Sequence, residues 1–216
     1  MMSFKHAYLI EAHKDDYVFY SLLKMLDHEL NDIFIHMDAK NVEFDNEKAK
    51  KAIQRGRLFF TQRTSVMWGG YSQINAELLL LKEATQTNKY AYYHLLSGQD
   101  LPIKPQSYIH DFFEKNSGLE FVRFEKESFQ YHDRTKYYYW LQDKIGRKYK
   151  FLTASLIAIQ KLFHVNRNKD ITFQKGSNWF SITDGLARYV VSKEAWIRKT
   201  FHDTICCDEV FLQTII

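Results

Sequence analysis

The feature that most constrains the fold is a regular alternation of short apolar runs with amphipathic segments over the first 125 residues. The apolar runs have the length and the β-branched and aromatic content of buried strands. They cover 6–13, 31–38, 57–63, 90–98 and 119–126. Alternating strands and helices predict a mostly parallel sheet covered by helices, that is, an α/β fold.

The intervening segments carry helix signals. In the segment 14–30, Val18, Leu22 and Leu26 are spaced to share one helical face, and Asp15 or Asp16 can cap its start. Further helices are expected over 46–56, 72–86 and 106–116. Pro105 is expected in the first turn of the last of these, with Gly118 at its end.

The second half of the chain is harder to interpret. Residues 129–170 are basic and aromatic, and within them only 152–165 has a helical pattern. A strand, a turn and helices are expected over 171–201. No linker composition separates the two halves, so the 216 residues are expected to form a single domain.

Composition narrows the function classes. A formal charge of +4 is far below that of typical nucleic-acid-binding domains, so no nucleic-acid partner is expected. No apolar run reaches the 18 residues of a transmembrane helix. Cys206 and Cys207 favour a reducing compartment, and we expect them to pack as a buried pair at a strand end. A cytoplasmic location follows as an expectation, with peripheral membrane association left open.

Common catalytic motifs are absent from the sequence. It contains no P-loop, no glycine-rich dinucleotide fingerprint after the first strand, no H-E-x-x-H and no G-x-S-x-G. Because open parallel sheets bind ligands beyond the carboxyl ends of their strands, the residues that follow the strands are the candidates. These are His13, Asp38, Trp68 and Asp100.

Each carboxylate also has a structural interpretation. Asp38 can cap the segment that follows it, and Asp100 can shape a tight turn in SGQD. Asp208 can stabilise the start of the last helix, and Glu209 can be an ordinary helix residue. From the residues alone, both interpretations stay open.

Six segments together resemble one known family. They are AYLIEAHKD, IFIHMDAK, VMWGGYSQINAELLLLKEA, YYHLLSGQDLPIK, GSNWFSITDGLARYVV and DEVFLQT, in this order. They are similar to the core-2/I-branching glycosyltransferases, which include β-1,6-N-acetylglucosaminyltransferases and peptide O-xylosyltransferases. The resemblance runs from about residue 6 to the end, and WGG and GSNWF are closer to the xylosyltransferase branch. A bacterial member is expected.

The resemblance implies a GT-A-type, Rossmann-like fold. Residues 1–125 would form the nucleotide-sugar-binding half and 126–216 the acceptor-side half. It also implies inverting transfer of GlcNAc or xylose from a UDP-sugar to a hydroxyl of a glycan or other acceptor. No divalent metal is expected, because the family lacks a working D-x-D motif and this sequence has none either.

The resemblance also assigns roles to residues. Glu209 of the DE pair would be the general base, since inverting transfer needs one base on the face opposite the leaving group. The residues assigned to the nucleotide sugar are His13, Asp38 and Asp100, and Trp68 is added to them because it is expected just after the third strand. Those assigned to the sugar or the acceptor are Ser177, Asn178, Trp179, Arg134 and Lys136.

One departure from the family concerns the diphosphate. The family's Arg and Lys that hold it lie beyond the DE helix, so this chain is expected to be incomplete at its C-terminus, with Lys175 and Arg188 as candidate substitutes. The sequence is also compatible with two other functions. One is a nucleotide-sugar or glycan-binding module of the same fold without turnover, and the other is an unrelated doubly wound nucleotide enzyme.

Overall fold

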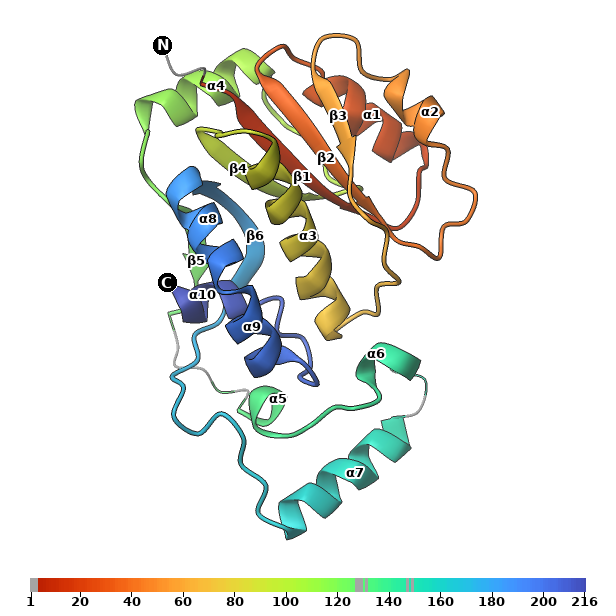
Figure 1. Cartoon of the computed structure of the whole chain (residues 1–216), viewed down its shortest axis with the longest axis vertical. Helices are drawn as coiled ribbons and strands as arrows, with labels where there is room; N and C mark the ends of the chain where they lie inside the picture. Colours follow the sequence, from red (N-terminus) through yellow and green to blue (C-terminus); the bar gives the residue numbers. More distant parts are fainter. Residues whose placement is uncertain (1–3, 127–129, 131, 147, 149) are drawn as a thin grey trace. The chain divides into compact units, whose positions relative to one another are not determined.

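A computed structural model describes residues 4–126, 130, 132–146, 148 and 150–216 (Figure 1). The strands in this part of the chain are β1 His6–Ala12, β2 Asn31–Met37, β3 Arg57–Phe60, β4 Tyr92–Ser97, β5 Phe121–Phe124 and β6 Gly176–Thr183. The first helices are α1 Tyr17–Leu26, α2 Asn46–Lys50, α3 Tyr71–Thr87, α4 Gln106–Lys115 and α5 Asp133–Lys136. The later ones are α6 Gln142–Ile145, α7 Lys150–Leu162, α8 Asp184–Ser192, α9 Glu194–Phe201 and α10 Phe211–Ile215.

The strands form one sheet in the order β3-β2-β1-β4-β6-β5. β1 pairs in parallel with both β2 and β4, and β2 pairs in parallel with β3. β6 runs antiparallel to β4. The predicted α/β architecture, with a mostly parallel sheet flanked by helices, is therefore confirmed, and it is consistent with a GT-A-like fold.

Contacts divide the chain into two compact units. Unit 1 consists of residues 1–65, 76–121 and 179–191. Unit 2 consists of residues 66–75, 122–178 and 192–216. Each unit thus combines segments that lie far apart in the sequence.

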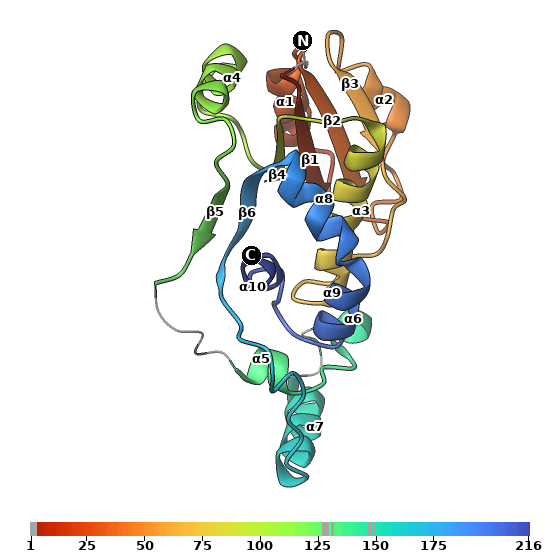
Figure 2. The same cartoon turned by 60° about the vertical axis from the view of Figure 1, so that its left-hand side comes forward.

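The core of unit 1 is built on the two faces of the parallel strands. Because side chains alternate along a strand, Tyr8 and Ile10 share one face with Ile33 and Ile35. The apolar face of α1 packs against these side chains. Figures 1 and 2 show α1 and α3 on opposite faces of the sheet. Both faces are thus covered, which explains why the strands read as continuous apolar runs.

Local signals place several helix ends. Asp16 caps α1, as one of the two predicted aspartates, by accepting hydrogen bonds from the amides of Val18 and Phe19 at 3.1 and 3.2 Å. Pro105 was expected inside the first turn of α4, but it occupies the preceding cap position with an extended ψ of 156°. Gly118, with φ +87°, lies three residues beyond the last residue of α4.

Unit 2 contains short helices joined by long loops. The prediction that Cys206 and Cys207 form a buried pair at a strand end is wrong. They lie in the loop between α9 and α10, where Cys207 is buried and Cys206 is half-buried with φ +50°. Among the described residues, no helix has the length and apolar character needed to span a bilayer.

Candidate active site

In unit 1, the carboxyl ends of β1, β2 and β4 meet at one edge of the sheet. Backbone hydrogen bonds tie the loops that follow them: the Asp38 amide donates to the Ala12 carbonyl at 2.8 Å, and the Gly98 amide donates to the Glu11 carbonyl at 2.8 Å. His13 is exposed here, whereas Asp38 is buried. The predicted strand-end residues His13 and Asp38 therefore follow neighbouring strands at the same edge.

The carboxylate of Asp38 organises its own loop. It accepts a hydrogen bond from the Lys40 amide at 2.9 Å and forms an ion pair with the Lys40 ammonium at 3.2 Å. Arg63 fastens the same loop by donating to the carbonyls of Met37 at 3.1 Å and Asp38 at 2.9 Å. The capping role considered for Asp38 thus has a direct geometric basis.

Asp100 similarly shapes the turn after β4. Its carboxylate accepts a hydrogen bond from the Ser97 amide at 2.8 Å. In the same turn, the side-chain amide of Gln99 donates to Asp16 at 3.1 Å, which links this loop to the start of α1. The turn interpretation of Asp100 is therefore realised, and it fixes where the carboxylate lies.

A cavity of about 470 Å³ lies within unit 1. Asp100 and Trp179 both line it, together with Lys104, Tyr108 and Ser181. Aromatic rings suit the C–H face of a sugar, and the carboxylate and ammonium can hydrogen-bond to its hydroxyls. The structure thus brings one residue assigned to the nucleotide sugar and one assigned to the sugar or the acceptor to the same cavity.

Trp68 does not belong to this edge. It was expected just after the third strand, but β3 ends at Phe60, eight residues earlier, and Trp68 belongs to unit 2. Its side chain is exposed. The long loop between β3 and α3 is the reason that a strand-end assignment failed.

In unit 2, the Asp208-Glu209 pair lies in a turn that leads into α10. The amides of Val210 and Phe211 both donate to the Cys207 carbonyl, which closes the turn. The Glu209 carbonyl accepts from the Gly176 amide at 2.9 Å, and this bond ties the turn to the start of β6. A side chain at Gly176 would place its Cβ 1.7 Å from the Arg123 carbonyl oxygen, so only glycine fits there.

Two cations approach the carboxylate of Glu209. Arg134 Nη1 lies 3.2 Å and Lys175 Nζ 3.5 Å from Glu209 Oε2. Lys175 also donates to Glu125, and these two carboxylates, Glu125 foremost, raise the pKa of the Lys175 ammonium. The Glu209 side chain is 38% exposed, so a ligand can reach it.

Asp208, the neighbour of Glu209, is buried. Burial and, secondarily, the negative charge of Glu209 raise the pKa of Asp208 to about 6. The side-chain amide of Gln73 lies 3.3 Å from the Asp208 carboxylate and donates to it. Two adjacent carboxyl groups thus have different environments, which is a common arrangement where one of them must exchange protons.

The WGG turn is shaped by a carboxylate distant in sequence. Asp143 accepts from the amides of Tyr71 at 3.0 Å and Ser72 at 3.1 Å, and thereby caps α3. A Cβ at Gly70 would lie 2.1 Å from Asp143 Oδ1. The carbonyl of Gly69 accepts from the Cys206 amide at 2.8 Å, so this turn contacts the loop that carries Asp208 and Glu209.

The remaining predicted residues lie at several places. Ser177 and Asn178 are half-buried neighbours on β6, and the Ser177 carbonyl accepts from the Gln213 side chain at 2.7 Å. Lys136 Nζ lies 5.5 Å from the ring centre of Tyr137. Arg188, the candidate diphosphate cation, pairs instead with Asp184 on its own helix α8 at 2.9 Å.

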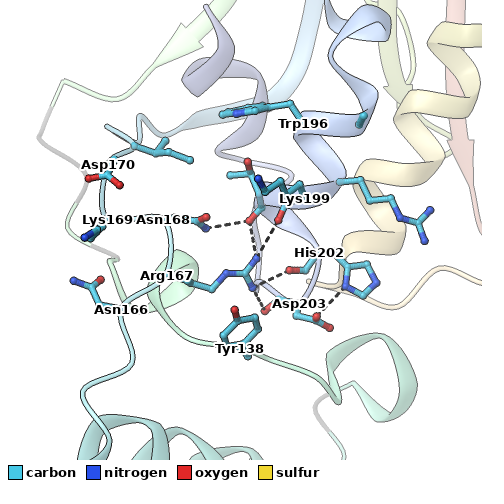
Figure 3. A pocket seen from close by; sticks show the side chains of 14 residues that line it. Tyr138, Asn166, Arg167, Asn168, Lys169, Asp170, Trp196, Lys199, His202 and Asp203 are labelled. Atoms are coloured by element: carbon cyan, nitrogen blue, oxygen red, sulfur yellow. Dashed lines mark hydrogen bonds and ion pairs between the residues drawn. The ribbon is translucent and has the colours of Figure 1, made fainter.

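Figure 3 shows a second, wider cavity of about 900 Å³ within unit 2. Arg167 is one of the residues that line it, and it donates to the carbonyls of His202 at 2.9 Å and Thr200 at 3.1 Å, at the end of α9. Its guanidinium also lies 4.4 Å from the ring centre of Tyr138. Arg167 therefore serves as a cap for the C-terminus of α9, where a cation is favoured by the helix dipole.

Comparison with known families identifies the chain. The family model described as Core-2/I-Branching enzyme matches residues 6–216. The chain belongs to the Core-2/I-branching enzyme family. Membership implies glycosyltransferase activity, with a nucleotide-sugar donor and a glycan acceptor. No curated protein matches the sequence.

In this Core-2/I-branching enzyme, sequence reasoning missed residues that act through long-range hydrogen bonds. Arg63, Gln73, Asp143 and Arg167 each join segments at least 22 positions apart. No local pattern marks them, because the neighbouring sequence does not show which distant group a polar side chain contacts. Positions that co-vary among related sequences would indicate such contacts.

Proposed function

We propose that this Core-2/I-branching enzyme transfers GlcNAc or xylose, with inversion, from a UDP-sugar to a hydroxyl of a glycan acceptor. In this proposal Glu209 is the general base. The observation that carries the proposal is the setting of Glu209, a partly exposed carboxylate that lies beside a buried one and is held by Arg134 and Lys175.

The proposed step is an in-line displacement. The acceptor oxygen forms a bond to the anomeric carbon as the bond from that carbon to the UDP oxygen breaks, and UDP leaves with the electron pair. The acceptor proton passes to Glu209. Because Arg134 and Lys175 both approach Oε2, we assign the proton to Oε1.

The donor and acceptor assignments complete the proposal. His13, Asp38 and Asp100 are assigned to the nucleotide sugar. The residues assigned to the sugar or the acceptor are Ser177, Asn178, Trp179, Arg134 and Lys136. The shared cavity of Asp100 and Trp179 supports their assignment to a sugar ring.

We also propose that transfer needs no divalent metal. The proposal rests on the absence of a D-x-D motif from the sequence. The charge that develops on the leaving diphosphate would then be stabilised by cationic side chains. A chelator should consequently leave the rate unchanged.

The decisive experiment compares Glu209→Gln with Glu125→Gln. Both glutamates contact Lys175, so Glu125→Gln reproduces the loss of one carboxylate beside that lysine. Transfer is measured with UDP-GlcNAc and UDP-xylose in the presence of EDTA, and UDP binding is measured by calorimetry. Glu209→Gln should lower kcat roughly 10²- to 10⁴-fold, since this is the range for general-base catalysis, and should leave UDP binding intact.

The outcomes separate the candidate functions. Equal transfer by wild type and Glu209→Gln would remove Glu209 from the mechanism. Equal losses in both variants would assign the effect to the Lys175 contacts. A wild-type chain that binds UDP but transfers neither sugar would favour a nucleotide-sugar-binding module, which is the second candidate.

A further inference from the structure

The WGG turn, Trp68–Gly70, contacts the loop that carries Asp208 and Glu209. The Gly69 carbonyl accepts a hydrogen bond from the Cys206 amide at 2.8 Å. Gly69 has φ +72°, and a Cβ there would lie 3.0 Å from Cys206 Sγ, which is closer than ordinary van der Waals contact. Glycine at this position therefore permits both the turn and its close approach to the loop.

Gln73, in the first turn of α3, connects the WGG turn with Asp208. Its side-chain oxygen accepts a hydrogen bond from the Gly69 amide, and its side-chain nitrogen donates to Asp208 Oδ2 at 3.3 Å. Because the oxygen bonds to the Gly69 amide, the side-chain amide is oriented with its donor toward Asp208. One side chain thus joins the turn to the carboxylate that precedes Glu209.

The start of α3 does not require the Gln73 side chain as a cap. Asp143 accepts hydrogen bonds from the amides of Tyr71 and Ser72, and the backbone amide of Gln73 donates to the Gly70 carbonyl at 3.2 Å. The first amides of the helix are therefore satisfied without the Gln73 side chain. Its donor is consequently directed away from its own helix, toward Asp208.

Asp208 needs a hydrogen-bond donor because it is buried. Burial and, secondarily, the negative charge of Glu209 raise the pKa of Asp208 to about 6, so above that pH it is charged beside a second carboxylate. A buried carboxylate that loses a donor either takes up a proton or moves toward solvent. Either change would alter the position or the environment of Glu209, because the two residues are adjacent in one turn.

We propose that Gln73 is a positioning residue for transfer: through Asp208, it holds Glu209 in the orientation in which Glu209 receives the acceptor proton. This inference rests on the proposed function, in which Glu209 is the general base. Arg134 and Lys175 contact the Glu209 carboxylate, whereas Gln73 acts on the turn from which that side chain extends. Because catalysis tolerates little displacement, a shift of this turn by about 1 Å should lower the rate roughly 100-fold.

The test compares two glutamines that hold the same turn. Gln73→Met approximately preserves the length of the side chain and removes its hydrogen bonds. Gln142→Met is the matched control, because the Gln142 side chain donates to the Trp68 carbonyl of the WGG turn at 2.8 Å. A second variant, Gln73→Glu, keeps an acceptor for the Gly69 amide and replaces the donor to Asp208, so it tests that one contact.

Each substitution is made in the wild type and in Glu209→Gln, and kcat, the KM for the donor, and UDP binding by calorimetry are measured. In the wild type, both Gln73 variants should lower kcat roughly 10- to 100-fold and leave KM and UDP binding unchanged. Gln142→Met should stay close to wild type. In Glu209→Gln, the Gln73 variants should cause no further loss, because residues that act as a unit are not additive.

Four results would overturn the proposal. Wild-type kcat in both Gln73 variants would do so directly, and an equal loss in Gln142→Met would assign the effect to the turn as a whole. A loss of the same factor in Glu209→Gln would show that Gln73 acts independently of Glu209, which would remain the base. Wild-type transfer by Glu209→Gln alone would refute the base itself. That comparison changes nothing at Gln73, so it separates failure of the proposed function from failure of this inference.

Discussion

Units 1 and 2 are stabilised in different ways. Every residue of β2 is buried, and the sheet of unit 1 is covered by apolar helix faces, so burial of apolar area provides most of its stability. In unit 2, single polar side chains hold loops and helix ends, as Asp143 does for α3, Gln160 for Tyr138 and Arg167 for α9.

The apolar core of unit 1 and the polar contacts of unit 2 serve different purposes. The apolar sheet of unit 1 provides a rigid edge, at which loops can carry polar residues without being part of the core. The hydrogen-bonded loops of unit 2 instead bring together charged groups from distant segments, as they do around Glu209. Substitutions in the two units should therefore differ in size and in what they disturb.

The largest effect is expected from acid, and it should arise in unit 1. His6, His94 and His110 are buried together, with 3.0 Å between His94 Nε2 and His6 Nδ1. Burial lowers the pKa of His94 to about 3 and of His110 to about 4, with neighbouring histidines adding to the effect. Ser181 and Asn31 hydrogen-bond to the cluster, and both are uncharged.

These lowered pKa values determine how the free energy of unfolding changes with pH. Below pH 6.5 the unfolded chain gains protons on these histidines that the folded chain does not, so the free energy of unfolding falls as the pH falls. Each histidine contributes about 1.4 kcal/mol per pH unit between its unfolded and folded pKa. Urea unfolding between pH 7 and pH 5 should therefore show a loss of several kcal/mol.

The contribution of the cluster can be isolated by substitution. The pH slope should decrease in the variant with both His94→Gln and His110→Gln, whatever its absolute stability. Between pH 7 and pH 5 the carboxylates with lowered pKa, such as Asp32, stay ionised in both states, whereas Asp208 takes up a proton in the folded state and offsets part of the loss in wild type and variant alike. An unchanged slope would contradict the prediction.

The next effect concerns the core of unit 1. Phe34 is fully buried, stacks on Phe59 with 4.8 Å between ring centres, and meets the edge of Tyr90. Phe34→Ala should lower the free energy of unfolding by about 3–5 kcal/mol, since a large buried ring is lost. Phe163→Ala is the control, because that ring is 74% exposed in unit 2. Equal losses in the two variants would contradict the assignment of Phe34 to a core.

The same contrast explains what the sequence could predict. The strands and α1 were recognisable because burial leaves a period in the sequence, and Asp16 was recognisable because a cap acts on the next few residues. Trp68 was misplaced because the loop after β3 has no period. Asp143 acts on residues 71 positions or more away, and sequence spacing carries no information about such a contact.

For the candidate site, the Asp208-Glu209 pair was identified from the sequence, whereas its setting was not. Lys175 was considered only as a cation for the diphosphate, and its contacts with Glu125 and Glu209 come from a loop next to β6. The burial of Asp208 is likewise a property of the folded turn. A general base must be ionised and must lie within hydrogen-bond distance of the acceptor hydroxyl. Neither property of Glu209 can be predicted from the sequence.

A smaller loss of stability is expected when the cap of α9 is removed. Arg167→Lys keeps the charge but cannot donate to several carbonyls at once, as the guanidinium does. The free energy of unfolding should fall by about 1–3 kcal/mol, the range for leaving buried polar groups without partners. Hydrogen exchange should accelerate in the last turn of α9. Arg198→Lys, an exposed site on the same helix, should change neither quantity.

The smallest effect should come from the cap of α3. Asp143→Ala removes the acceptor for the amides of Tyr71 and Ser72 and for the Ser72 hydroxyl at 2.6 Å. Loss of an N-cap costs about 1 kcal/mol, and exchange of these two amides should accelerate. Asp170→Ala, at an exposed carboxylate of unit 2, controls for the lost charge. If Asp143→Ala were as harmful as Phe34→Ala, the polar contacts of unit 2 would be as cooperative as a packed core, and the distinction between the units would fail.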